Sequence, residues 1–229
     1  MLIAEELLLL LTEVESGAPL ADSTSLTYAL AGANLLELSL AGKVDVAGPA
    51  DSVKKGRLVV RDPGLTGDAL LDHALEVLAR RGNKRPRDVI RHLAKGVRTD
   101  VYTRLAERGV VRRVDSKVLG LFPRTRWPIT DPVQRERPRY SVEQLVLGQG
   151  SQSDPHVSAL VSLLAAIDKL PRVVPPENVG LSKRQIRQRG KEISADSWAP
   201  QAVKDAVAAV NAAMTGAIVA GSIAGASSS

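Results

Sequence analysis

Residues 23–40, with the sequence STSLTYALAGANLLELSL, set the fold class of this chain. Four leucines in the stretch share one broad face of a helix; they are Leu26, Leu30, Leu35 and Leu38. Gly42 follows, and glycine is the residue that most often ends a helix. The stretch therefore predicts a helix with a wide buried face, and we analysed the rest of the chain outward from it.

Helical periodicity continues on both sides of this segment. We expect further helices over 2–11, 66–82, 86–107 with a break at Gly96, 141–147, 155–169, 177–188 and 201–220. Short strands are expected over 44–47 and 57–61, and a β-hairpin is expected with strands 110–114 and 118–122 around the turn 115–117. Four prolines between 123 and 138 predict an irregular connection. The pattern is that of a mainly α fold.

The domain organisation and location follow from what the chain lacks. No repeat and no long linker divides it, so we expect one domain over 1–229 with a frayed Gly/Ser tail from about Gly221. The apolar start contains two glutamates and no basic leader, so we expect a cytoplasmic protein without an export signal. Residues 206–225 are rich in Ala, Gly and Ser, which favours a packed terminal helix over a membrane span.

Composition excludes several kinds of site. The chain has no cysteine, which removes thiol catalysis and zinc–thiolate sites, and its three histidines do not form a compact metal motif. No nucleophile elbow, phosphate loop or dinucleotide fingerprint is present. We therefore expect no metal, no cofactor and no enzymatic activity. The strongest catalytic alternative is Asp68, Asp72 and His73, but two carboxylates one turn apart more often form a solvated helix face.

Positive charge is concentrated in the middle of the chain. The net charge is +6, yet residues 80–139 hold 18 basic and only 6 acidic side chains. Such an excess favours an anionic partner, either an acidic membrane surface or a nucleic acid. A solvated arginine-rich face is the plain alternative.

Three cations of this basic segment have a spacing that suggests a site. Arg91, Lys95 and Arg98 lie at i, i+4 and i+7, so an unbroken helix would place them on one face. If Gly96 breaks the helix, Lys95 and Arg98 instead flank the start of its second part, where free backbone N–H groups favour a phosphate. Both geometries predict an anion pocket, and separate solvated cations are the alternative.

The expected hairpin carries apolar and basic residues together. Its candidate contact residues are Arg112, Arg113, Val114, Val118 and Leu119. Apolar side chains beside cations suit a membrane interface. The same element could be the wing of a winged-helix nucleic-acid binder, an oligomer contact, or a part packed within its own protomer. The sequence leaves these alternatives open.

Several motifs in order resemble the Golgi phosphoprotein 3 family. They are the opening LIAEELLLL at 2–10, LAGANLLELSL at 30–40, TGDALLD at 66–72 and RLAERGV at 104–110. The resemblance implies a central helical bundle wrapped by amphipathic helices, with a projecting hairpin that serves oligomerisation and membrane contact. It also implies phosphoinositide binding by an adaptor and places two binding cations on Lys95 and Arg98. Where the family has a tryptophan and an arginine, this chain has Asp22 and Ala31.

From these observations we expect a non-enzymatic, cytoplasmic protein peripheral to a membrane. It would bind anionic lipid headgroups, of which phosphatidylinositol 4-phosphate is one example, and act as an adaptor for cytoplasmic segments of membrane proteins. Oligomerisation through the hairpin is expected, and the composition is typical of a bacterial, actinobacterial-type member. The alternative is a winged-helix-like nucleic-acid-binding protein. The low aromatic content argues against a stacking platform for single-stranded nucleic acid.

Overall fold

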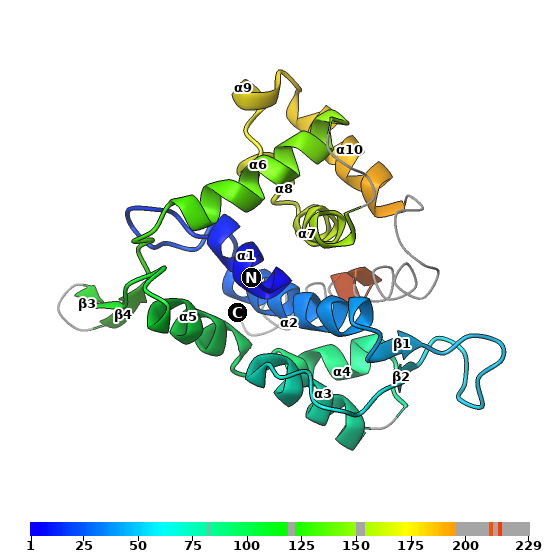
Figure 1. Ribbon diagram of the computed structural model, residues 1–229. Helices are drawn as coiled ribbons and strands as arrows, with labels where there is room; N and C mark the ends of the chain where they lie inside the picture. Colours follow the sequence, from blue (N-terminus) through cyan, green and yellow to red (C-terminus); the bar gives the residue numbers. More distant parts are fainter. Residues whose placement is uncertain (82, 119–121, 150–153, 196–210, 213–214, 217–229) are drawn as a thin grey trace, which may run out of the picture.

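The computed structural model describes residues 1–81, 83–118, 122–149, 154–195, 211–212 and 215–216. Two helices form its centre, α1 (Ile3–Leu10) and α2 (Ser23–Leu40) (Figure 1). Asp22 caps α2, because its carboxylate accepts a hydrogen bond of 2.8 Å from the Ser25 N–H. Nearly every side chain of α1 and most of those of α2 are buried. The two helices are therefore the core around which the remaining helices pack.

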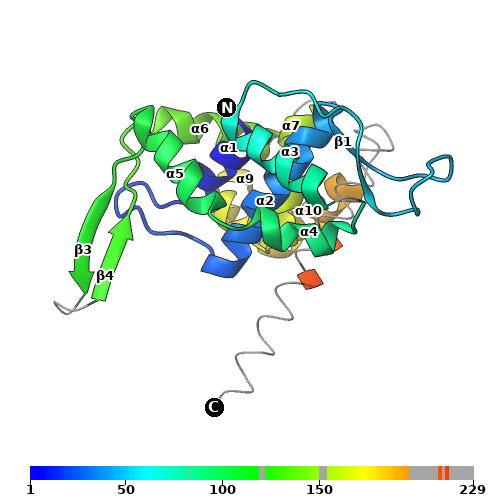
Figure 2. The ribbon, with the colours of Figure 1, turned by 90° about the horizontal axis from the view of Figure 1, so that it is seen from below.

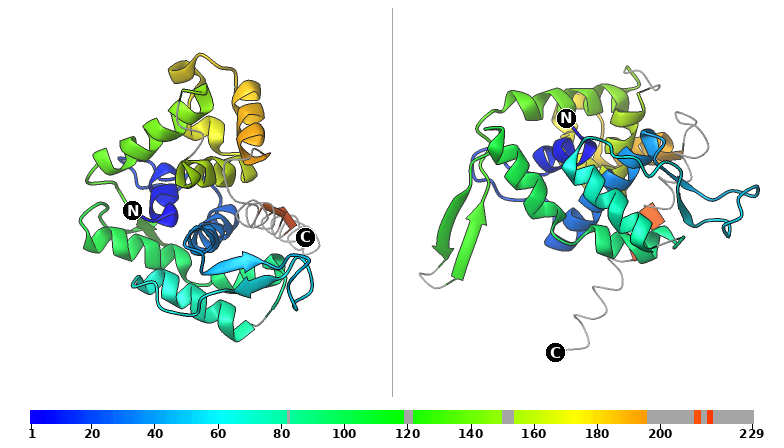
Figure 3. Two further views of the ribbon diagram at one scale, coloured as in Figure 1. Left: turned by 45° about the vertical axis from the view of Figure 1, so that its right-hand side comes forward. Right: turned by 60° about the horizontal axis from the view of Figure 1, so that its bottom comes forward.

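Helices surround this core on two sides (Figures 1 and 3). On one side lie α3 (Ala69–Arg81), α4 (Pro86–Leu93) and α5 (Val97–Glu107), and on the other lie α6 (Val133–Leu147), α7 (Pro155–Ala166), α8 (Leu170–Val173), α9 (Pro176–Val179) and α10 (Lys183–Ala195). The outer helices are amphipathic; α4, for example, buries Val89, Ile90 and Leu93. The mainly α fold with a central bundle is confirmed.

Two antiparallel hairpins complete the described fold. The first pairs β1 (Val44–Val46) with β2 (Leu58–Val60), as the sequence predicts. The second pairs β3 (Val114–Val118) with β4 (Phe122–Arg126) and projects from the body of the molecule (Figure 2). The predicted turn at 115–117 is wrong, since Asp115 lies in β3 and pairs with Thr125.

The hairpin is displaced along the chain because its first predicted residues belong to the body. Val110 and Val111 are buried, and Val110 accepts a hydrogen bond of 2.9 Å from the Thr130 N–H. Val111 forms an isolated bridge with Ile129. These contacts hold the two ends of the hairpin together at its base, so the strands form farther along the chain.

Two of the predicted helices have different bounds. Helix α6 begins at Val133 and contains Pro138, where an irregular segment was predicted. Pro138 removes one helical N–H, but the ion pair between Glu136 and Arg139 spans this point. The single helix predicted over 177–188 is wrong as well: Gly180, with φ +65°, separates α9 from α10.

The C-terminal part of the chain is described only in fragments. Residues 211–212 and 215–216 are helical, and the rest of the helix predicted over 201–220 lies outside the described residues, as does the tail from Gly221. Within the described ranges, none of the helices has the length and apolar character needed to cross a bilayer.

Candidate functional site

The junction between α4 and α5 confirms the predicted break at Gly96. This glycine precedes α5 with φ +81°, a conformation that few other residues adopt easily. The start of α5 has no side-chain cap. Lys95 therefore lies just before an uncapped helix start and Arg98 in its first turn, where the helix dipole favours an anion. The only acid of this first turn is Asp100.

We call Arg91, Lys95 and Arg98 the cationic junction. These side chains differ in the polar contacts that they make. Arg91 and Lys95 are exposed and, within the described part of the chain, have no carboxylate within ion-pair distance. Arg98 is partly buried and weakly bonded, with 3.4 Å between its Nη1 and Ser23 Oγ. The charges of Arg91 and Lys95 are thus available to a ligand, and Arg98 is held only by a long hydrogen bond.

The three cations do not line one common cavity. Lys95 lines a small void toward α3, together with Asn34, Leu70 and Asp100, and this void includes neither Arg91 nor Arg98. Arg98 leans instead toward the start of α2. The geometry is therefore an open cationic surface around the Gly96 turn, and a shared pocket stays a prediction.

A stack of side chains connects the cationic junction to the hairpin. The rings of Tyr102 and Trp127 are parallel within 5°, with centroids 4.8 Å apart. The Arg98 guanidinium lies 5.8 Å from the centroid of Tyr102, and that of Arg113 lies 6.0 Å from the centroid of Trp127. We call these four residues the ladder. It runs from α5 to the base of the hairpin.

The base of the hairpin is fixed by contacts with the loop between α1 and α2. A Cβ atom on Gly17 would lie 2.3 Å from Pro128 N and from the carbonyl carbon of Trp127, so only glycine fits there. Gly17 also accepts a hydrogen bond of 3.3 Å from the Trp127 N–H, and Val14 accepts one of 2.9 Å from the Ile129 N–H. The hairpin therefore leaves the body in a defined direction.

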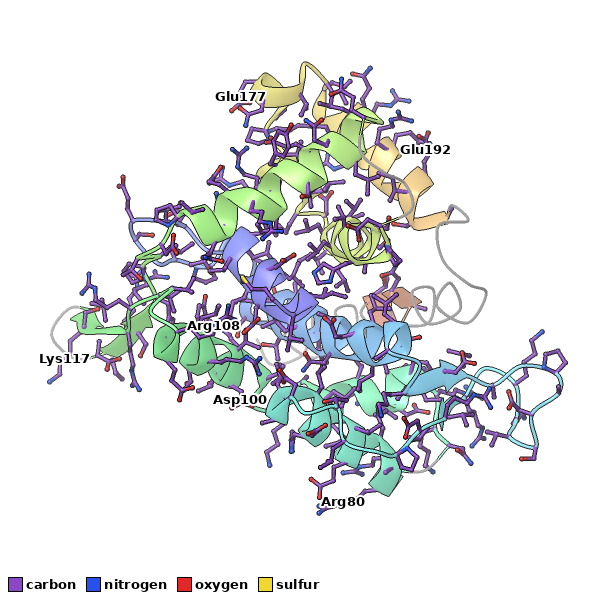
Figure 4. All side chains as sticks on the ribbon, viewed as in Figure 1. Arg80, Asp100, Arg108, Lys117, Glu177 and Glu192 are labelled. Atoms are coloured by element: carbon purple, nitrogen blue, oxygen red, sulfur yellow. The ribbon has the colours of Figure 1, made fainter. Side chains whose placement is uncertain are left out.

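The described surface of the hairpin is strongly cationic. Arg112, Arg113, Lys117 and Arg124 are exposed, and Figure 4 shows Lys117 on this projecting element. Asp115 is the one acid of the two strands, and it is engaged by Arg113 at 3.0 Å. Val114 is partly buried. Leu119 and the side chain of Val118 lie outside the described residues, so the predicted apolar tip is not tested.

The family of the chain follows from a comparison over nearly its whole length. The model of the family Golgi phosphoprotein 3 (GPP34) matches residues 3–210. This chain belongs to the Golgi phosphoprotein 3 family. A search of curated proteins finds no match to it. The structure adds the mainly α fold and the projecting hairpin that the resemblance implies.

The resemblance implies a tryptophan and an arginine at two positions where this Golgi phosphoprotein 3 family member has Asp22, just before α2, and Ala31, in the middle of α2. Asp22 caps the helix there, and although its partial burial acts to raise its pKa, hydrogen bonds from Ser25 and from other backbone N–H groups lower the pKa overall. Ala31 is fully buried and contributes no polar group. A carboxylate thus occupies the helix start beside Arg98, which disfavours a second negative charge at that end of α2.

In this family member the carboxylates considered for catalysis, Asp68 and Asp72, stabilise the start of α3. Asp72 accepts hydrogen bonds of 2.6 Å from both the backbone N–H and the hydroxyl of Thr66, which lower its pKa. Asp68 caps α3 through the Leu70 N–H at 3.0 Å and forms an ion pair with Arg104. Both groups are engaged at the start of α3, and the absence of enzymatic activity stays a prediction.

Glu5, the most buried charge among the described residues, was not among the predicted site residues. The Glu5 side chain is 1 % exposed and accepts hydrogen bonds from Arg104 at 2.8 Å and from Arg108 at 2.9 Å. These two arginines belong to the basic segment, but both pair with Glu5, about a hundred positions away, and Arg104 also pairs with Asp68. The sequence did contain a signal for this cluster: Glu5 lies in the apolar run 2–11, and a carboxylate buried with such a run requires partners.

Proposed function

We propose that this protein is a peripheral membrane protein that recognises anionic lipid headgroups through Arg91, Lys95 and Arg98. The observation that carries the proposal is that Arg91 and Lys95, beside an uncapped helix start, have no ion pair among the residues that the structure describes. Membership of the Golgi phosphoprotein 3 family supports it.

The hairpin supplies the second part of the proposed membrane contact. A single cation near an anionic leaflet contributes about 1 kcal/mol, whereas micromolar affinity requires about 8 kcal/mol. The cationic junction alone is therefore too weak. Arg112, Arg113, Lys117 and Arg124 add positive charge on an element that projects from the body. An oligomer formed through the hairpin would add avidity.

The headgroup and the partners form the finer part of the proposal. Phosphate chemistry suits the helix start at Gly96, and a phosphatidylinositol 4-phosphate-like headgroup is the specific candidate. Asp22 reduces the preference for a headgroup with more than one charge, so general anionic lipids compete well. In the proposed role the protein is cytoplasmic and non-enzymatic, and as an adaptor it binds cytoplasmic segments of membrane proteins.

Vesicle co-sedimentation tests the proposal. Binding to anionic vesicles should exceed binding to neutral phosphatidylcholine vesicles, and Lys95→Glu with Arg98→Glu should reduce it by tenfold or more. Because Arg98 also contacts Ser23, Arg91→Glu with Lys95→Glu serves as a second variant that changes only exposed, unpaired cations. Lys54→Glu with Lys55→Glu is the control with the same change of net charge, in the exposed loop between β1 and β2.

Two results would contradict the proposal. The first is equal binding to neutral and anionic vesicles. The second is an equal loss of binding in the junction variants and in the control, which would mean that only net charge matters. Tighter binding to duplex DNA than to vesicles, with a steep salt dependence, would favour the winged-helix-like alternative.

A further inference from the structure

Helix α10 and the turn before α8 form a second cationic surface, separate from the basic segment. Helix α10 buries Ile186, Gly190 and Ile193 on one face. The other faces carry five cations and a single acid, Glu192. Four cations of the surface have no ion pair within the described residues; we call them the α10 cluster, and they are Lys169, Lys183, Arg184 and Lys191.

The α10 cluster borders a groove. This groove has a volume of about 630 Å³, and Lys169 and Lys183 line it with Arg172. Its walls include four prolines, which are Pro19, Pro171, Pro175 and Pro176. Because proline has few backbone conformations, these walls are stiff and the groove is preformed.

The surface is held in place by close packing and by one ion pair. A Cβ atom on Gly190 would lie 2.6 Å from Leu170 Cδ2, so α10 packs closely against the start of α8. Arg187 donates two hydrogen bonds to Asp168, of 2.6 and 3.1 Å, next to the groove. The start of α10 is already capped, because the Ser182 hydroxyl accepts a hydrogen bond of 3.3 Å from the Gln185 N–H. A ligand would therefore meet the side chains of the α10 cluster and the groove, and not a free helix start.

The position of the surface indicates what it binds. Figures 1 and 3 show α10 on the side of α1 and α2 opposite to α4 and α5. In Figure 4, Glu192 on α10 and Asp100 on α5 lie on opposite sides of the molecule. The membrane contact that the proposed function states is made by the cationic junction and the hairpin, and α10 belongs to neither. A protein partner can therefore occupy α10 while that contact is in place.

We infer that the α10 cluster and its groove bind an acidic peptide segment of a partner protein. Three carboxylates also line the groove, but Asp168 pairs with Arg187 and Glu13 lies 4.0 Å from Arg172. Glu177 is thus left to repel a continuous polyphosphate, whereas an acidic peptide can place a neutral or basic side chain beside it. A helix of 13 residues is about 20 Å long, which an extended peptide of about six residues matches.

A labelled peptide tests the inference. The probe is a fluorescein-labelled octapeptide of alternating Glu and Ser, and the matched control peptide has Gln in place of Glu. Fluorescence anisotropy should show binding of the Glu peptide only. Lys183→Glu with Arg184→Glu should weaken it by tenfold or more; both side chains lie in the first turn of α10, where acidic residues are compatible with the helix dipole. Lys54→Glu with Lys55→Glu should leave the affinity within twofold.

The outcomes separate this inference from the proposed function. The Lys183/Arg184 variant should keep its vesicle binding, and bound anionic vesicles should not displace the peptide. No peptide binding, equal weakening by both double variants, or displacement of the peptide by vesicles would overturn the inference. Duplex DNA that competes for α10 at equal or higher affinity would also overturn it. Failure of vesicle binding alone would refute the proposed function and leave the peptide result standing.

Discussion

The two ends of helix α5 carry similar numbers of cations but use them differently. At its C-terminal end, Arg104 and Arg108 converge on the buried carboxylate of Glu5. At its N-terminal end, Lys95 is exposed and has no ion pair within the described residues, and Arg98 has only a long contact with Ser23. Net charge therefore overstates what a ligand can meet. Cations bound to buried carboxylates stabilise the fold, and only the remaining ones are available for binding.

The largest effect is expected for Arg104 and Arg108, at the C-terminal end of α5. Arg104→Met with Arg108→Met leaves the Glu5 carboxylate buried without a cation, and we expect a loss of about 3 to 5 kcal/mol in the free energy of unfolding. Urea denaturation measures it. Arg91→Met with Lys95→Met is the matched control and should change the stability by less than about 1 kcal/mol, since exposed cations without partners contribute little. Similar losses of stability in both variants would contradict the distinction between cations bound to a buried carboxylate and exposed cations.

An intermediate effect is expected where the ladder connects the N-terminal end of α5 to the hairpin. Gly17→Ala places a Cβ atom 2.3 Å from the backbone of Trp127 and Pro128, so the base of the hairpin must move. We expect a loss of about 2 to 3 kcal/mol and a shift of the Trp127 fluorescence.

Gly42→Ala is the control for this change. Gly42 has φ +69°, close to the +62° of Gly17, but no atom lies within 4 Å of its added Cβ. Its substitution should therefore cost only about 1 kcal/mol from backbone strain and leave the tryptophan signal unchanged. Equal losses at the two glycines would mean that contact with Trp127 and Pro128 plays no part.

The smallest effect concerns His156, which also lies against a carboxylate. Its Nε2 lies 3.0 Å from Glu6 Oε2. Burial acts to lower the pKa of His156, but the hydrogen bond to Glu6 and the charges of Glu6, Glu37 and Asp154 outweigh it, so the pKa is raised. Because the folded pKa is raised, the stabilisation is complete below the unfolded pKa of about 6.5 and is lost as pH rises through the folded pKa.

His156→Gln should therefore destabilise the protein on the order of 1 kcal/mol at about pH 5.5, and by less at about pH 8.5. Urea denaturation at both values measures the difference. His73→Gln is the control, because its exposed ring lies 4.0 Å from Glu76 and should contribute little at either pH. An equal effect of His156→Gln at both values would show that its charge does not matter.

The fold was largely predictable because its helices are encoded locally. The helix α2 follows from leucines a few residues apart, and the break before α5 follows from Gly96. The structure confirms both predictions. The hairpin turn was misplaced because β propensity identified Val110 and Val111 as strand residues. Propensity did not show that these two residues contact Thr130 and Ile129 at the base of the hairpin. Pairing between distant residues, which propensity does not contain, decides the register.

The candidate site was predictable only in part. Spacing singled out Lys95 and Arg98, and the structure places both around the Gly96 turn. The ladder was not predictable, because Tyr102 and Trp127 are 25 positions apart and stack only after the hairpin returns to the body. The α10 cluster was missed as well, since residues 140–229 hold 8 basic and 7 acidic side chains, and this near balance does not show which cations of α10 lack an ion pair among the described residues.

The amino-acid sequence by itself determined the helical character of the chain, the break at Gly96 and the excess of cations, because these depend on neighbours within a few residues. Tertiary structure alone decided which cations are free. Glu5 and Asp68 engage Arg104 and Arg108, Glu5 across about a hundred residues, while Arg91 and Lys95 have no ion pair among the described residues. The physical reason is that a buried carboxylate must be neutralised by whatever cations the packing brings to it.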